Sequence, residues 1–192
     1  NSFIIGTALG LTSGFSIPVA HAFGAGDRKK LSKYAANSVS LAFLIGVVIV
    51  VVAHIISDRL LKLIGTDEDI IGMSSAYVNI LYYGVPIQML SNNFTALARA
   101  VGESKKPLYF FCVSVVVNFV LDLLFVKEFG WGIEGAALAT LISYGVACSL
   151  GAVYIMRFNK DIDLHLSSLK PDLRISFEQI KLGIPVSLQF TM

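Results

Sequence analysis

Residues 107–126 read PLYFFCVSVVVNFVLDLLFV, a run in which Asp122 is the single charged residue. A helix that crosses the hydrocarbon core of a bilayer needs about 20 mostly apolar residues, so this run has the length and composition of one span. Four further stretches contain no Asp, Glu, Lys or Arg: residues 2–26, 34–57, 70–98 and 135–156. The sequence therefore predicts an all-α, polytopic membrane protein, a bundle of transmembrane helices.

The composition of the whole chain agrees with this fold class. Of its 192 residues, 55% are hydrophobic and 15% are charged, whereas soluble domains are about 25% charged. We expect the lipid bilayer as the surrounding partner and no nucleic acid. Cys112 and Cys148 lie in apolar runs without CxxC or Cys/His spacing, so neither a disulfide framework nor a zinc site is expected, and no cofactor is predicted. The expected spans are 2–23, 34–56, 70–98, 107–126 and 133–156.

The distribution of cations predicts the orientation of the helices. Lys and Arg concentrate in cytoplasmic loops of membrane proteins. Of the 15 cations, all but Arg59, Lys62 and Lys127 lie in loops 24–33 and 99–106 and in segment 157–181. We therefore expect these three connections to be cytoplasmic and the protein to reside in the plasma membrane.

The long polar segment 157–181 divides the sequence. Residues 1–156 are interpreted as one lobe of five helices, 157–181 as a linker, and 182–192 as the start of the first helix of a second lobe. Gly183-Ile-Pro185 in that last stretch repeats the pattern of Gly84-Val-Pro86. The sequence begins without Met and the last helix is cut short, so we interpret the chain as a fragment.

Asp122 is the strongest functional candidate, because a charged side chain inside a span costs about 2.5 to 3.5 kcal/mol on insertion scales. Asn118 lies four residues earlier, on the same helix face. Counting residues from the intervening turn places Thr140 on the next helix at a depth similar to that of Asp122, so Asn118, Asp122 and Thr140 are predicted to form a site for Na⁺ or a proton. The alternatives are that Asp122 is solvated near its helix end and that Thr140 bonds only to its own helix.

Two amides of the third predicted helix could contact a substrate. Gln88 and Asn92 are four residues apart and share a face. Hydrogen bonding between helices is the alternative role for such side chains.

Several strings resemble the multidrug and toxic compound extrusion (MATE) family of twelve-helix transporters. The first runs from Pro18 to Asp27, with His21 where that family usually has Gln. The second runs from Arg99 to Pro107. The third is Asn118-Phe-Val-Leu-Asp122, followed by the string from Gly132 to Ser143.

The resemblance implies one lobe of a two-lobe, secondary active antiporter that exports drugs or other cationic or amphipathic molecules, driven by entry of Na⁺ or H⁺. It places Asn118, Asp122 and Thr140 at cation-site positions and implies a transporter that is monomeric. The family's first helix, which carries its own acidic residue, is missing here, so we expect this fragment to be inactive alone.

Other functions fit the sequence less well. A lipid-linked oligosaccharide flippase of similar architecture would favour cations in its central cavity, and the predicted spans contain none. An enzyme is not expected, because neither an HExxH zinc motif nor a Ser/His pair at matching depth is evident. A purely structural membrane subunit would tolerate Leu in place of Asp122.

Overall fold

A computed structural model of the chain describes residues 2–63, 68–159, 161–164, 169 and 171–191. The described part is helical and contains no strand. The helices are α1 (Ser2–Phe15), α2 (Ile17–Gly24), α3 (Arg28–Leu63), α4 (Glu68–Ala100), α5 (Lys105–Asp122), α6 (Gly132–Val153) and α7 (Leu173–Thr191). Two π-helical segments, η1 (Leu123–Glu128) and η2 (Tyr154–Phe158), directly extend α5 and α6.

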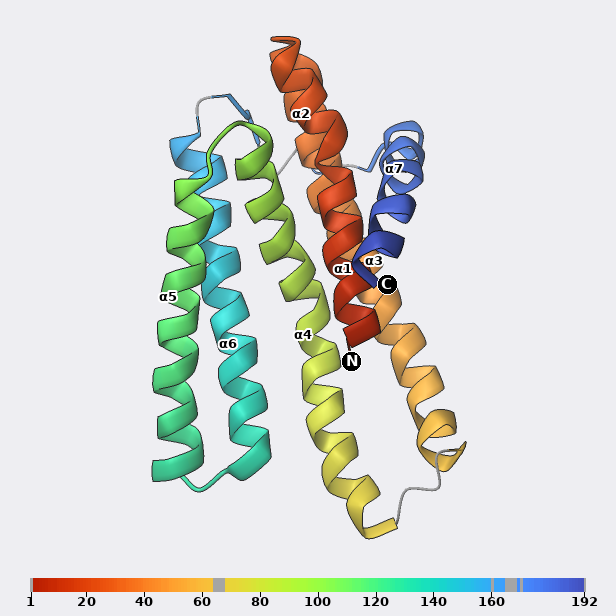
Figure 1. Cartoon of the computed structure of the whole chain (residues 1–192), viewed down its shortest axis with the longest axis vertical. Helices are drawn as coiled ribbons and strands as arrows, with labels where there is room; N and C mark the ends of the chain where they lie inside the picture. The colour runs from red at the N-terminus through yellow and green to blue at the C-terminus, as the bar shows by residue number, and fades with distance from the viewer. Residues whose placement is uncertain (1, 64–67, 160, 165–168, 170, 192) are drawn as a thin grey trace.

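The helices form a bundle whose long axes run roughly parallel (Figure 1). Helices α5 and α6 make an antiparallel hairpin on one side, α4 lies between this hairpin and the rest, and α1, α3 and α7 lie on the other side (Figure 1). The α2–α3, α4–α5 and α6–α7 connections, which are rich in cations, all lie at one end of the bundle. We call this end the cationic end.

The first predicted span is interrupted near its middle. Helix α1 ends at Phe15 and α2 begins at Ile17, with Pro18 in its first turn. Proline lacks a backbone N–H and cannot continue the ladder of a helix interior, which explains the break. Pro86, by contrast, lies inside the continuous helix α4.

The last helix starts earlier than predicted. Residues 173–181 were assigned to the linker, but α7 already begins at Leu173. The Oδ1 atom of Asp172 accepts the backbone N–H groups of Arg174 and Ile175 at 3.0 and 3.4 Å, as an N-cap does. This local cap, and not overall polarity, decides where the helix begins.

The main hydrophobic core lies toward the cationic end. Val19 of α2, Leu31 of α3, Leu97 of α4 and Ile155 of η2 are fully or almost fully buried there. Farther along the bundle, α3 and α4 pack around a smaller cluster that includes Met89. The core therefore ties the hairpin to the other helices mainly at the cationic end.

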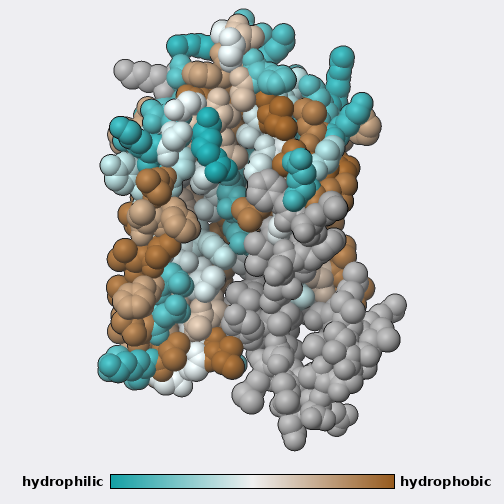
Figure 2. All heavy atoms as spheres, viewed as in Figure 1, coloured by the Kyte–Doolittle hydropathy of each residue, from teal (hydrophilic) through white to brown (hydrophobic). Residues whose placement is uncertain are grey.

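The outer surface of the hairpin is apolar. Large hydrophobic side chains of α5 are exposed, Phe111 and Phe119 each to 63%. Figure 2 shows hydrophobic side chains along this side, below a cap of hydrophilic residues at the cationic end. Three helical stretches are long and apolar enough to cross a membrane among the described residues: 28–53, 105–128 and 132–158. Such an exposed surface suits contact with lipid.

Candidate ion and substrate site

Asn118 and Thr140 meet between α5 and α6. The Nδ2 atom of Asn118 lies 3.5 Å from the Thr140 hydroxyl oxygen, a long hydrogen bond in which the amide donates. The same hydroxyl donates to the carbonyl of Ala136 at 2.9 Å. Thr140 therefore bonds to its own helix, the alternative raised from the sequence, and also contacts Asn118.

Asp122 lies one turn beyond Asn118, at the last residue of α5. Its Oδ1 atom is buried and has no hydrogen-bond partner among the described residues. A buried polar atom without a partner costs about 1 to 3 kcal/mol, and more when it is charged. Asp122 is therefore placed to gain from a bound cation or proton.

The structure brings two of the three predicted ion-site residues into contact across the hairpin. Counting from the turn placed Asp122 level with Thr140, whereas Asn118 is the residue that contacts Thr140. The π-helical segment η1 follows Asp122 immediately, and its wider turns advance less along the axis per residue. Asp122 lies one helical turn beyond Asn118 along α5, toward the α5–α6 connection.

A cleft of about 280 Å³ opens beside the Asn118–Thr140 contact, between α4, α5 and α6. Its polar lining includes Ser91, Asn92 and Ser143, and its aromatic lining includes Phe110 and Tyr144. None of its described lining residues is Lys or Arg. The cleft can therefore offer amide and hydroxyl groups to a small molecule, with rings beside them.

The two candidate amides of α4 have different positions. Asn92 lines the cleft, and its buried Nδ2 atom has no hydrogen-bond partner among the described residues. Gln88 donates from Nε2 to the Tyr144 hydroxyl at 3.2 Å and does not line the cleft. Gln88 therefore positions Tyr144, the interhelical role raised as its alternative, whereas Asn92 faces the cleft.

Tyr144 was missed by the sequence reasoning. A tyrosine within the apolar helix α6 resembles an ordinary packing residue. The sequence could have indicated Tyr144 by its spacing, because Tyr144 lies four residues after Thr140 and therefore on the same helix face.

Comparison with known proteins shows the family to which this chain belongs. The sequence pattern of the MatE family matches residues 1–124, more than half of the chain. The chain belongs to the MatE family. Its all-α membrane fold, the extent of a single lobe and the resemblance to MATE transporters are thereby confirmed.

Two relatives of this MatE chain come from bacteria. Probable multidrug resistance protein YoeA of Bacillus subtilis (strain 168) is 32% identical over 98% of the chain and 42% of YoeA. Multidrug export protein MepA of Staphylococcus saprophyticus is 27% identical over 96% of the chain and 40% of MepA. The MatE chain thus spans about two fifths of the length of these relatives.

Two solved structures show the same fold in different states. A multidrug resistance MATE family transporter of the MOP superfamily in its inward-facing conformation superposes with a TM-score of 0.89 at 27% identity. That match covers 99% of this chain and 43% of the transporter. An outward-facing conformation of such a transporter gives the same TM-score and covers 98% and 42%. This chain is therefore equally similar in fold to transporters solved in both states.

Proposed function

We propose that this chain is the N-terminal lobe of a secondary active antiporter, which exports drugs or other cationic or amphipathic molecules while Na⁺ or H⁺ enters. The names of YoeA and MepA support export of drugs. The equal likeness to inward- and outward-facing transporters supports a lobe that rocks as one body. A family of multidrug exporters also favours transport over an enzymatic function.

The observation that carries the coupling proposal is the buried, unpartnered Oδ1 atom of Asp122. A cation or a proton at this oxygen removes the cost of the unpaired carboxylate. Asn118 uses its amide nitrogen toward Thr140, so its carbonyl oxygen is available as a second ligand one turn away. Carboxylate and amide oxygens are ligands that hard cations prefer.

The cleft supports a cationic or amphipathic substrate. Phe110 and Tyr144 line it beside the unpaired amide of Asn92. Aromatic faces attract organic cations, and the described lining holds no cation to repel them. A flippase for lipid-linked oligosaccharides, the second candidate, would have to bind an anionic group without Lys or Arg in this lining.

Transport assays with the full-length protein test this proposal. The protein is reconstituted in vesicles loaded with a fluorescent cationic dye, and Na⁺ and pH gradients are imposed separately. We expect dye movement under one of the gradients, and its loss in Asp122→Asn, which keeps the shape but removes the charge. Glu134→Gln is the matched control, because Glu134 is an exposed carboxylate on α6.

The outcomes separate the candidates. Equal transport by Asp122→Asn and the wild type would reject Asp122 as a coupling residue. Absence of dye transport together with movement of a fluorescent lipid-linked sugar would favour the flippase. We further propose a monomeric protein in the plasma membrane, with the cationic end on the cytoplasmic side, which follows from the shared position of the cation-rich connections.

A further inference from the structure

Three aromatic rings gather at the turn between α5 and α6. The ring centroids of Phe125 and Trp131 lie 5.1 Å apart, and those of Phe129 and Trp131 lie 5.5 Å apart. The centroids of Phe125 and Phe129 are 6.1 Å apart. All three separations lie in the range over which aromatic rings attract one another. We call Phe125, Phe129 and Trp131 the aromatic turn.

The backbone of the turn brings these rings together. The Trp131 N–H donates to the carbonyl oxygen of Phe125 at 2.9 Å, and the Phe129 N–H donates to that of Leu124 at 3.0 Å. Gly130, between the last two rings, has a φ of 67°. Glycine adopts this left-handed conformation without a steric cost. The hydrogen bonds and the glycine therefore fix the relative positions of the rings.

Helix α6 leaves room for the aromatic turn at Gly135. A Cβ atom added to Gly135 would lie 2.9 Å from the Cβ atom of Phe125 and 3.1 Å from the Cβ atom of Trp131. Gly135 is buried, whereas Trp131 is 51% exposed and Phe129 is 56% exposed. The aromatic turn is therefore packed against α6 on one side and open to its surroundings on the other.

The aromatic turn lies where two candidate membrane spans end. The apolar stretches 105–128 and 132–158 both reach it, at the end of the bundle opposite the cationic end (Figure 1). Exposed apolar side chains continue from the turn along α5. Exposed charged side chains accompany the rings: Lys127, Glu128 and Glu134. The turn therefore joins an apolar surface to a charged one, as aromatic residues do at the boundary between membrane and water.

We propose that the aromatic turn anchors the α5–α6 hairpin in the interfacial layer of the bilayer, between the phospholipid headgroups and the acyl chains. An indole suits this layer, because its apolar body contacts acyl chains while its N–H donates to lipid oxygens. The other two rings hold Trp131 in place. The anchoring requires only that the hairpin spans a membrane, not that the protein transports drugs.

The anchor also has a consequence for Asp122. Phe125 follows Asp122 by three residues, about one helical turn. A hairpin held at the aromatic turn therefore keeps the Asp122 carboxylate at a constant depth, about one turn below the headgroups.

Depth-dependent quenching of Trp131 fluorescence tests the proposal. Trp131 is the single tryptophan of this chain, and tryptophans elsewhere in the full-length protein are replaced by Phe. The protein is reconstituted in vesicles of phosphatidylcholine that is brominated either near the headgroup or near the end of the acyl chain. We expect bromine near the headgroup to quench Trp131 more strongly.

Phe119→Trp in a Trp131→Phe background is the matched control. Phe119 is exposed on α5, nearer to the middle of the span, so bromine near the chain end should quench it more strongly. For Trp131, the same order as in this control would overturn the proposal. Quenching of Trp131 by aqueous iodide but by neither lipid would place the ring in water, and quenching by none of the three would show that protein covers it. Either result would also overturn the proposal.

A second arm asks whether the rings hold the hairpin. A spin label is attached to Lys127→Cys in a full-length protein whose other cysteines are replaced by Ala. Its depth is measured from the ratio of its collision rates with oxygen and with a water-soluble nickel chelate. We expect this ratio to shift when Phe129→Leu and Trp131→Leu are combined, because leucine is apolar but lacks the ring and the N–H donor.

The control for this arm combines Phe111→Leu and Phe119→Leu. It also removes two exposed rings of α5, but away from the turn, and should leave the ratio unchanged. A ratio that stays at the wild-type value in both combined variants would show that the rings provide no anchoring and would overturn the proposal. The quenching measurement keeps Trp131 and Phe129, so it decides the question even if their combined replacement prevents folding.

Discussion

Substitutions can separate the hydroxyl of Thr140 from the shape of its side chain. Its hydroxyl donates to its own helix at Ala136 and accepts from Asn118. A role in ion binding requires the hydroxyl oxygen, whereas a role in packing requires only the shape of the side chain. Valine keeps that shape and serine keeps the hydroxyl.

We expect Thr140→Val to weaken the apparent affinity of the full-length transporter for its coupling ion roughly five-fold, the equivalent of one net hydrogen bond of about 1 kcal/mol. Thr140→Ser should retain the wild-type affinity. The measurement is the dependence of dye transport on Na⁺ or proton concentration. Equal affinities in Thr140→Val and the wild type would show that the Thr140 hydroxyl has no role in ion binding.

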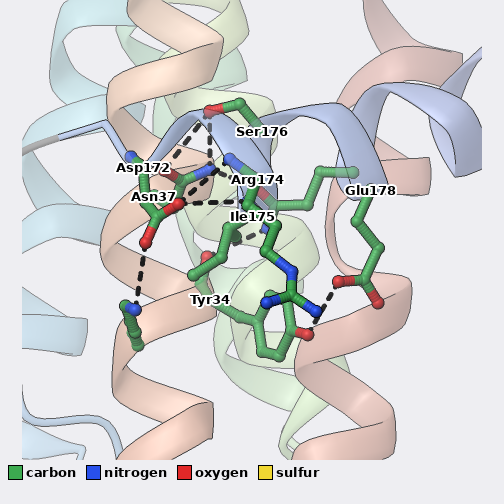
Figure 3. Close-up of polar contacts among 9 residues, drawn as sticks. Tyr34, Asn37, Asp172, Arg174, Ile175, Ser176 and Glu178 are labelled. Carbon is green, nitrogen blue, oxygen red and sulfur yellow. Dashed lines mark hydrogen bonds and ion pairs between the residues drawn. The ribbon is translucent and has the colours of Figure 1, made fainter.

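Asp172, whose polar contacts Figure 3 shows, makes the start of α7 sensitive to acid. The Lys33 ammonium, 3.0 Å from Asp172 Oδ2, and the N–H groups of Ile175 and Arg174 hold the pKa of this carboxyl below its ordinary value. Because the pKa is lower in the folded state, the ionised carboxylate stabilises the fold above the unfolded pKa of about 3.9. That contribution is lost as the pH falls through the folded pKa.

Asp172→Asn should therefore unfold at a lower temperature than the wild type near neutral pH, and the difference should shrink as the pH falls below about 4. Thermal unfolding in detergent, followed by tryptophan fluorescence across this pH range, measures both effects. Glu134→Gln serves as the comparison. A constant difference between Asp172→Asn and the wild type at every pH would contradict the assignment.

Single residues also show how far sequence reasoning reached. Asp122 was identified as the single charge in an apolar run, and Asn118 because a spacing of four places it on the same helix face. The partner of Thr140 depended on the course of the chain beyond Asp122, where η1 widens the helix. No periodic pattern indicates such a π-helical segment, so the sequence could not predict which residue of α5 contacts Thr140.

At the scale of elements, α3 and α4 pack with almost no space between their backbones. A Cβ atom added to Gly46 of α3 would lie 2.7 Å from the Cα atom of Pro86 in α4. Gly145 of α6 has no atom within 4 Å of such a position. Alanine at Gly46 would be crowded by α4, whereas alanine at Gly145 would not be crowded. Comparing the stabilities of the two variants therefore separates the cost of crowding from the general effect of alanine on helix stability.

Gly46→Ala should destabilise the protein by about 1 to 3 kcal/mol, the usual cost of overpacking. Gly145→Ala should be neutral or slightly stabilising, because alanine favours helix. Chemical or thermal unfolding of the two variants in one detergent provides the comparison. If both variants have the same stability, α3 and α4 can move apart without cost.

The sequence predicted the apolar helices α3 to α6, but it predicted neither the break between α1 and α2 nor the start of α7. Uncharged runs report hydrophobic length directly, and they located α4, α5 with η1, and α6 with η2 within two residues at each end. The predicted span 34–56 lies inside α3, which begins six residues earlier and ends seven residues later. Helix α7 begins in a polar stretch with exposed Arg174 and Glu178, while Ile175 and Gln179 face inward. Its signal was Asp172 as an N-cap after Pro171, a local feature that the polarity of the segment concealed.

At the scale of the whole molecule, the orientation in the membrane can be tested by labelling. With Cys112 and Cys148 replaced by Ala, single cysteines are introduced at Lys106 and at Lys127, at opposite ends of the bundle. A maleimide that does not cross membranes should label Lys127→Cys in intact cells and Lys106→Cys only after permeabilisation. The reverse pattern would place the cationic end outside the cell.

The hydrogen bonds from Gln179 of α7 to the carbonyl oxygens of Phe15 and Tyr34 impose an order on biosynthesis. The ribosome makes Gln179 145 residues after Tyr34, roughly 7 to 30 s later at ordinary rates of elongation. During this interval the carbonyl oxygens of Phe15 and Tyr34 lack the hydrogen bonds that the Gln179 amide donates in the finished fold. The hydrogen bonds between α7 and these two helices can therefore form only after the ribosome has made Gln179.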